Sequence, residues 1–373
     1  MKINKFLNVL YRGKIVGTLA LTKENKIAFV YADEWLEQGF SISPFSLPLE
    51  KRVFIPSKTH FQGLFGVFAD SLPDAWGNIL LNRVLRNHGI AADTLNPLDR
   101  LAITGGSGMG ALTYEPVMPI KSEVCGYDLD VLAGECRNIL EAKESEELDL
   151  LYRLGGTSGG ARPKIMTEID GKEWIIKFPA HFDRQNSGKM EYEYSLCAKK
   201  CGIRMTETRL FSSRECAGYF GIERFDRRKG ERIHMLTAAA LLELNFEEPS
   251  LDYHSLMKLT KILTGNSKHE VEEMFRRMCF NVFAHNRDDH SKNFTFIYEE
   301  AEDCWQLSPA YDLTYSTTYY GEHTTSVDGN GVNPSVKELM NVGRKAGISK
   351  ARCEEIIERV KECVETMLEE YLV

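Results

Sequence analysis

The sequence predicts an α+β protein with two lobes, a β-containing N-terminal part and a mainly α-helical C-terminal lobe. Three observations predict it. Residues 149–226 have the order strand, glycine-rich loop, strand, turn, strand and helix. From residue 227 onward the apolar residues recur mainly at helical spacing. A polar loop at residues 286–293 follows an apolar helix-like run and precedes a strand-like run, so it lies between regular elements. We therefore divide the chain into residues 1–118, 119–226 and 227–373.

The first region is expected to open with β structure, because apolar and polar residues alternate around residues 11–14 and again at 27–31. A helix is predicted from Trp76 to His88. Near residues 118–123 this pattern breaks, which indicates a linker. The residues expected to pack the helix into a core are Trp76, Ile79, Leu80, Val84 and Leu85.

The second region contains the glycine-rich segment LGGTSGGARPK at residues 154–164. It matches neither a Walker A motif nor a strict GxGxxG, but its glycines allow backbone N–H groups to approach phosphates. A strand at 164–169, an Asp170-Gly171 hairpin turn and a strand at 174–177 are expected next. This order places Lys177 where a lysine can bind nucleotide phosphates. The candidate phosphate-binding residues of the loop are Gly155, Gly156, Thr157, Ser158, Gly159 and Gly160.

A helix is predicted from Met190 to Lys200, before Gly202. Glu193 is the expected partner of Lys177, and Glu191 is its rival for that role. Taken singly, a strand lysine and a helix glutamate are usually exposed to solvent, so the inference depends on their order behind the glycine loop.

The third region holds the polar loop NRDDHSKN at residues 286–293, followed nineteen residues later by Asp312. Phosphoryl transfer needs one carboxylate to orient the attacking hydroxyl, an asparagine five residues later to hold Mg²⁺, and a second aspartate to bind metal and phosphates. Asp288, Asn293 and Asp312 match these roles. Asp and Asn also cluster in ordinary turns, which is the structural alternative. Lys292 could contact the transferred phosphate and His290 could brace the loop, or either could be structural.

The order Asp-x-His in this loop is closer to lipid kinases than to the His-Arg-Asp of protein kinases. Taken together, the chain resembles the HipA family of serine/threonine kinases, the toxins of bacterial toxin–antitoxin pairs. The motifs that carry the resemblance are GLFGVFADSLPDAWG at 63–77, GMGALTY at 108–114, GGARPK at 159–164, ERFDR at 223–227, the Asp288 loop and Tyr311-Asp312.

The resemblance implies a HipA-like bilobal kinase fold, with residues 1–118 as the HipA N-terminal subdomain, 119–226 as the kinase N-lobe and 227–373 as the C-lobe. It implies ATP and Mg²⁺ as cofactors, with Asp288 as the catalytic aspartate and Asn293 and Asp312 as Mg²⁺ ligands. Lys177 would contact the ATP phosphates. The backbone of Glu223 and Phe225 would form the adenine hinge.

In well-studied members of the family the glycine loop reads Ser-x-x-Gly-Ala-x-x-Lys, and phosphorylation of its serine expels the loop. Anchoring on Gly160, Ala161 and Lys164 places Thr157 at the serine position, with Ser158 beside it. The hydroxyl is kept but the residue differs. A phosphate on either residue would repel those of ATP, so both are candidate autophosphorylation sites.

The resemblance also implies partners. A small HipB-like helix-turn-helix antitoxin should bind this chain and make most of the DNA contact, and aminoacyl-tRNA synthetases are the family's best-known protein substrates. A formal net charge of −8 disfavours broad nucleic-acid binding by this chain alone. The basic run at 224–229, with Arg224, Arg227, Arg228 and Lys229, is interpreted as a solvated turn.

Composition places the protein in the cytoplasm. The chain has 373 residues, 43% of them hydrophobic, which is enough for substantial cores. Its nine cysteines include no Cys-x-x-Cys pair, so neither zinc nor a disulfide framework is indicated. We see neither a signal peptide nor an apolar run of membrane-spanning length, and expect no membrane contact.

Two more segments have structural interpretations. The glycine cluster at 104–110 is interpreted as a turn, since no lysine-bearing strand follows it at a suitable distance. A last helix is expected from Ser349, a capping residue, to Tyr371. The residues expected to form its buried stripe are Ile356, Val360, Val364, Met367 and Tyr371.

Two other functions stay open. The chain could retain ATP affinity but act mainly as a corepressor with its antitoxin, although the intact set of Asp288, Asn293 and Asp312 argues against this. It could instead be a small-molecule or lipid kinase, as the Asp-x-His order suggests.

Overall fold

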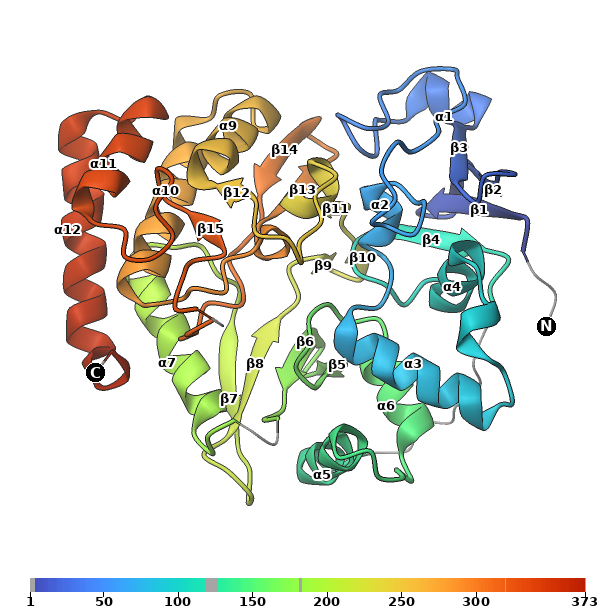
Figure 1. The fold of residues 1–373 in the computed structure, drawn as a ribbon, viewed down its shortest axis with the longest axis horizontal. Helices are drawn as coiled ribbons and strands as arrows, with labels where there is room; N and C mark the ends of the chain where they lie inside the picture. The colour runs from blue at the N-terminus through green and yellow to red at the C-terminus, as the bar shows by residue number, and fades with distance from the viewer. Residues whose placement is uncertain (1–3, 119–126, 181–182, 319, 373) are drawn as a thin grey trace.

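The structure is a computed structural model that describes residues 4–118, 127–180, 183–318 and 320–372. Helices and sheets are combined in one chain, which confirms the predicted α+β class (Figure 1). The helices near the C-terminus lie at one end of the molecule and the first sheet at the other, with a second sheet between and below them. The predicted linker at 118–123 falls almost entirely within residues outside the described part.

The N-terminal region begins with a four-stranded antiparallel sheet of order β3-β2-β1-β4. The β structure expected at the start of the chain is therefore confirmed, and Leu7, Val9, Leu10 and Tyr11 of β1 are buried in the core. The elements of this region are β1 (Phe6–Tyr11), β2 (Lys14–Leu21), β3 (Ile27–Tyr31), α1 (Asp33–Gln38), α2 (Gly66–Ala69), α3 (Ala75–Asn87), η1 (Ala92–Thr94), α4 (Pro97–Thr104) and β4 (Leu112–Glu115).

Helix α3 joins this region to the next one, because it packs along α6 (Leu148–Gly155) and shares a core with the second sheet. Helix α6 lies where a strand was predicted before the glycine-rich loop, so that prediction was wrong: the buried residues Leu148, Leu151 and Gly155 recur at helical spacing. Trp76 is fully buried in that core beside Ile165 and Ile176 of the sheet. The prediction for α3 was wrong at one position: Ile79 is 37% exposed, since it lies on the outer side of the helix. Helix α5 (Leu129–Leu140) also contributes to this core.

The second sheet has the order β5-β6-β8-β7 with antiparallel neighbours. Its first hairpin turns at Asp170 and Gly171, whose φ angles of +54° and +73° fit the predicted Asp-Gly turn. Helix α7 (Ser187–Lys200) packs on β7 and β8. The strands are β5 (Lys164–Ile169), β6 (Lys172–Lys177), β7 (Thr208–Phe211) and β8 (Tyr219–Glu223).

The C-terminal lobe is built on α10, which contacts α9, α11 and α12. A small sheet of order β11-β13-β14 accompanies these helices, so the lobe holds more β structure than predicted. Its elements are β9 (Arg227–Arg228), β10 (Glu231–Arg232), β11 (Met235–Thr237), α8 (Ala238–Leu241), β12 (Leu251–Asp252), α9 (Tyr253–Leu263), α10 (Lys268–Phe283), η2 (Ser291–Asn293), β13 (Thr295–Glu299), β14 (Cys304–Leu307), β15 (Thr325–Ser326), α11 (Val336–Lys345), α12 (Lys350–Met367) and η3 (Glu369–Tyr371).

The last helix begins as predicted, because the Ser349 hydroxyl accepts a hydrogen bond from the Arg352 N–H at 3.3 Å. Ile356, Val360 and Val364 are buried, but Met367 is 40% exposed and Leu368 is buried in its place. The helix ends at Met367 rather than at Tyr371, which packs against the core from the following turn η3.

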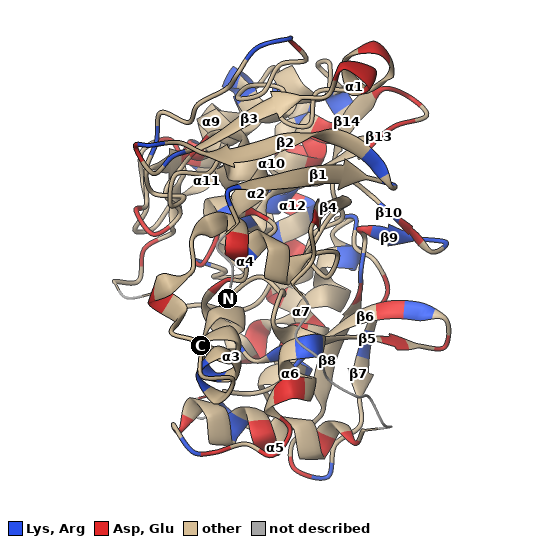
Figure 2. Ribbon diagram, turned by 90° about the vertical axis from the view of Figure 1, so that its right-hand side faces the viewer, with Lys and Arg blue, Asp and Glu red and all other residues tan. Residues whose placement is uncertain are grey.

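The basic run at 224–229 is not simply a solvated turn. Arg224 and Arg227 are largely buried and both pair with the fully buried Asp226, at 2.9 and 2.7 Å. The expectation holds for Arg228, which is exposed and pairs with Glu299 at 2.7 Å. Figure 2 shows both signs of charge interspersed over this side of the molecule, including the β9 and β10 hairpin.

Candidate active site

An ion-paired lysine lies between the two lobes. Lys177, the last residue of β6, donates to Glu191 Oε1 on α7 and to Asp312 Oδ1 in the loop after β14. Burial would lower the pKa of Lys177, but the two carboxylates outweigh burial and raise it. For Asp312, burial would raise the pKa, and the Lys177 and Lys164 charges instead hold it well below its usual range. Lys177 and Asp312 are therefore both charged at neutral pH.

The glutamate expected to pair with Lys177 was the wrong one. Glu193 accepts a hydrogen bond from the Tyr371 hydroxyl and lies 3.5 Å from Lys189, away from the lysine. Two residues along a helix differ by about 200° in direction, so only one of Glu191 and Glu193 can point at the sheet. The structure selects Glu191, the rival candidate, whose side chain is 6% exposed.

Two adjacent aspartates in the polar loop have opposite environments. Asp289 is fully buried and accepts hydrogen bonds from the Tyr253 hydroxyl at 2.8 Å and the Thr325 N–H at 3.0 Å. The side chain of Asp288 is 59% exposed. Asp289 therefore anchors the loop, and Asp288 is the carboxylate that an incoming hydroxyl can reach.

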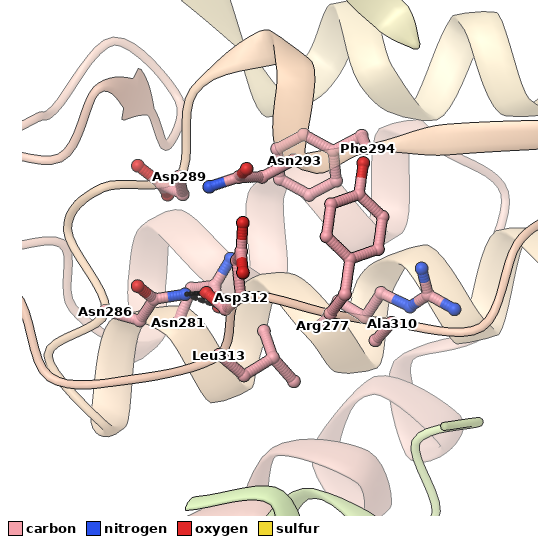
Figure 3. A pocket seen from close by; sticks show the side chains of 10 residues that line it. Arg277, Asn281, Asn286, Asp289, Asn293, Phe294, Ala310, Asp312 and Leu313 are labelled. Carbon is pink, nitrogen blue, oxygen red and sulfur yellow. Dashed lines mark hydrogen bonds between the residues drawn. The ribbon is translucent and has the colours of Figure 1, made fainter. Parts of the chain in front are cut away.

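Asn293 and Asp312 present oxygen atoms suited to a hard cation. The Asn293 Nδ2 donates to the Asp288 carbonyl at 2.7 Å, which leaves its Oδ1 available as a ligand. Figure 3 shows the Asp312 carboxylate extending toward the Asn293 side chain. Both residues line a cavity of about 10 Å³. The described residues contain no cluster of three or more His, Cys, Asp or Glu that could hold a metal by itself. Two oxygen ligands fit Mg²⁺, which usually completes its shell with phosphates and water.

His290 and Lys292 flank the same loop. His290 Nε2 lies 3.9 Å from Asp288 Oδ1, and its ring lies 5.8 Å from that of Phe246. Lys292 Nζ pairs with Asp74 and lies 4.3 Å from the centre of the Phe246 ring. Both predicted residues are therefore at the site, and Asp74 and Phe246 are two that sequence reasoning missed.

The glycine segment serves two structural purposes. Gly155 is the last residue of α6 and Gly156 its cap, and a side chain on either would clash with backbone atoms of Lys164 or Tyr152. These two glycines permit close packing, and their approach to phosphates stays a prediction. Gly159 and Gly160 lie beyond the helix, and Gly160 has a φ of +87° that favours glycine.

The two loop hydroxyls are buried. Thr157 is 4% exposed and donates to the Ser107 carbonyl at 2.8 Å, whereas Ser158 is fully buried and donates to the Gly155 carbonyl at 2.6 Å. Neither hydroxyl can meet a phosphate donor without movement of the loop.

A second lysine, Lys164, belongs to the site although the sequence indicated it only as a motif anchor. It is 6% exposed and its Nζ donates to the Gly159 carbonyl. Burial lowers its pKa, and the neighbouring Asp312 opposes that effect.

The predicted adenine hinge keeps part of its hydrogen-bonding capacity. The Glu223 N–H donates to the Glu207 carbonyl at 2.9 Å, so it is not available to a base. The Glu223 carbonyl accepts from the Thr206 hydroxyl at 2.6 Å and has a second lone pair. Phe225 stacks on Tyr311 with ring centres 5.6 Å apart.

The second glycine cluster, at residues 104–110, has the turn conformation expected of it and accepts hydrogen bonds from the side chain of Arg232. The carbonyls of Gly108 and Gly110 accept from Arg232 at 2.8 and 2.9 Å, and the Gly110 N–H donates to Asp226 at 2.8 Å. Its carbonyls thus face a cation, which is the opposite of a phosphate cradle.

Comparison with known proteins identifies the family to which the chain belongs. The family model of the HipA-like C-terminal domain matches residues 156–368, and that of the HipA N-terminal domain matches residues 7–115. The chain belongs to the HipA family. Its fold is similar to that of HipA in the Shewanella oneidensis MR-1 complex of HipA, HipB and operator DNA, with a TM-score of 0.72 and 17% identity over 98% of this chain and 90% of that one.

Two relatives of this HipA-family chain come from Sinorhizobium fredii (strain NBRC 101917 / NGR234). "Putative kinase Y4dM" is 28% identical over 54% of this chain, which spans about half (52%) of that protein's length. "Putative kinase Y4mE" is 24% identical over 84% of this chain and 78% of its own length. None of the helices in the described ranges is long and apolar enough to cross a membrane.

Proposed function

We propose that this HipA-family chain is an ATP- and Mg²⁺-dependent protein serine/threonine kinase, the toxin of a cytoplasmic toxin–antitoxin pair. The observation that carries the proposal is the junction of Lys177 with Glu191 and Asp312, beside the exposed Asp288 and the free oxygen of Asn293. This set holds the charges that phosphoryl transfer uses. The names of the two Sinorhizobium relatives support the same reaction class.

The residues have distinct roles in the proposed reaction. Asp288 accepts the hydrogen bond of the acceptor hydroxyl and takes its proton as the oxygen bonds to the γ-phosphorus and the bond to the ADP oxygen breaks. Lys177, oriented by Glu191, neutralises charge on the phosphates. Asn293 Oδ1 and the Asp312 carboxylate would hold Mg²⁺, which when bound adds positive charge next to the transferred group.

The proposal extends to partners. HipA of Shewanella oneidensis is in a complex with HipB and operator DNA. By analogy, a HipB-like helix-turn-helix antitoxin binds this chain and makes most of the DNA contact, because a chain with net charge −8 attracts DNA weakly. The substrate we propose is a translation-related protein such as an aminoacyl-tRNA synthetase.

Autophosphorylation at Thr157 or Ser158 is part of the proposal. Both hydroxyls are buried in the closed glycine loop. A phosphate on either would need several hydrogen-bond donors and water, which the buried position does not offer, so the modified loop would leave its site.

The test is label transfer in bacterial lysate from γ-labelled ATP with Mg²⁺, comparing wild type with Asp288→Asn. We expect label on a lysate protein and on the loop in wild type alone, mapped by mass spectrometry. Label on a metabolite or lipid would support a small-molecule or lipid kinase. Bound ATP with no transfer, and operator repression that persists in Asp288→Asn, would support a corepressor.

A further inference from the structure

We propose that Asp74, in the N-terminal region, is a positioning residue that holds the glycine loop closed against the catalytic loop. Its Oδ2 accepts a hydrogen bond from the Gly160 N–H at 2.9 Å. Its Oδ1 pairs with Lys292 Nζ, and both side chains are 17% exposed. One carboxylate therefore joins a backbone donor of the N-lobe to a cation of the C-lobe, from outside both lobes. The Lys292 part of the inference rests on the proposed kinase function, and the loop contact does not.

Asp74 lies at a position where an aspartate side chain normally caps its own helix. It is the N-cap of α3, where a carboxylate usually accepts from the N–H groups of the first turn, yet it makes no such side-chain bond. Its partners are instead 86 and 218 residues away in the sequence. The carboxylate thus acts between regions of the protein, at the expense of the cap.

The backbone around Asp74 is fixed against the glycine loop. Trp76 is fully buried, its ring Nε1 donates to the Lys164 carbonyl at 3.2 Å, and its backbone N–H donates to the Gly160 carbonyl at 3.3 Å. Since Lys164 and Gly160 belong to the strand and loop that would cover the nucleotide, α3 presents Asp74 to them in a defined place.

The position of Lys292 is set from two sides. Asp74 contacts its ammonium, and the face of Phe246 lies 4.3 Å from Nζ. A lysine side chain has four rotatable bonds, so holding its head before the reaction saves the cost of ordering it in the transition state. Asp74 thereby determines where the positive charge of Lys292 lies relative to the transferred phosphate.

The N-terminal region holds the glycine loop at two points. Ser107 accepts from Thr157 near the start of the loop, and near its end Gly160 donates to Asp74 and accepts from the Trp76 N–H. Opening the loop breaks these three bonds. Loss of Asp74 should therefore raise the population of the open loop.

The first experiment is hydrogen exchange of residues 155–163 in the nucleotide-free protein, which needs no enzymatic activity. Asp74→Ala removes both contacts, and we expect exchange on the order of tenfold faster there, the effect of losing one charge-assisted hydrogen bond. Asp74→Asn keeps an oxygen for the Gly160 N–H, so the loop should stay close to wild type. Asp93→Asn, on an exposed residue of the same region, is the control. Wild-type exchange in Asp74→Ala would overturn the inference.

The second experiment measures phosphoryl transfer. Asp74→Asn and Lys292→Met should each lower kcat by about tenfold or more, with a smaller effect on KM for ATP, and the double variant should lose no more than the worse single variant. Full additivity of the two losses would contradict a role through Lys292. If wild type transfers no phosphate, the proposed function fails, whereas hydrogen exchange still decides the loop contact. Asp74→Asn keeps this kinetic test of the Lys292 contact valid should Asp74→Ala fail to fold.

Discussion

Lys177 and Asp312 form an ion pair that joins the end of strand β6 in one lobe to the loop after β14 in the other, across 135 residues of sequence. With Glu191 they make a junction in which Lys177 and Glu191 are largely buried and the Asp312 side chain is 32% exposed. Removing one member of such a group leaves a charge buried without its partner, which typically costs about 3–5 kcal/mol. The site's charges are therefore also part of what holds the two lobes together.

The choice between two glutamates can be tested by a matched pair of variants. Glu191→Gln should lower kcat/KM for ATP by about 10–100-fold, because Lys177 loses the partner that orients it. Glu193→Gln should change kcat/KM by less than about threefold, since Glu193 contacts Tyr371 and Lys189 instead. Steady-state kinetics with ATP as the varied substrate measure both. Equal losses in the two variants would contradict the assignment.

Charge at the buried loop hydroxyl should weaken nucleotide binding. Thr157→Glu places a carboxylate where Thr157 donates to the Ser107 carbonyl, so the loop should open and the Kd for ATP should rise by about tenfold or more. Thr157→Val keeps the shape and loses only a hydrogen bond worth about 1 kcal/mol. Titration calorimetry with ATP compares them. Identical Kd values for Thr157→Glu and wild type would show that the loop does not respond to charge.

Stability should depend on the titration of Asp70, whose pKa burial raises to about 6, opposed by Lys292 and by hydrogen bonds from Thr237. Because the folded-state pKa lies above the unfolded value, this group favours folding most at low pH, and its contribution falls as pH rises from about 4 to about 6. The free energy of unfolding of Asp70→Asn, taken relative to that of wild type, should therefore be about 1–3 kcal/mol higher at pH 7 than at pH 4.

Denaturant unfolding of both proteins at pH 4, 5, 6 and 7 measures that difference. Other titrating groups are common to the two proteins and cancel in the comparison. A difference in the free energy of unfolding that is the same at each pH would contradict a raised pKa for Asp70.

Local patterns made much of the fold predictable. The Asp170-Gly171 turn, the capping Ser349 and the helical spacing around Trp76 each act within a few residues, and the structure has the elements they indicate. The loop of Asp288 and Asn293 was also recognisable, because its chemistry depends on short spacings.

The features that the sequence left open depend on the direction in which side chains point and on contacts between residues far apart in the sequence. Glu191 and Glu193 both flank tyrosines on α7, so no pattern tells which one faces the sheet. Gly155 and Gly156 look like loop residues until the helix before them is seen to extend to Gly155. Asp74 meets Lys292 across 218 residues, and nothing near either residue signals the contact. Arg224 looks solvated until Asp226 is found buried beside it.

The most direct test of the kinase assignment is label incorporation from γ-labelled ATP into the purified protein with Mg²⁺, for wild type, Asp288→Asn and the control Asp93→Asn. Wild type and the control should incorporate label, whereas Asp288→Asn should incorporate about 10²–10⁴-fold less while binding ATP within about twofold of wild type. Label in Asp288→Asn at the wild-type rate would contradict the role of Asp288. No label in any of the three, despite bound ATP, would contradict the self-phosphorylating kinase itself.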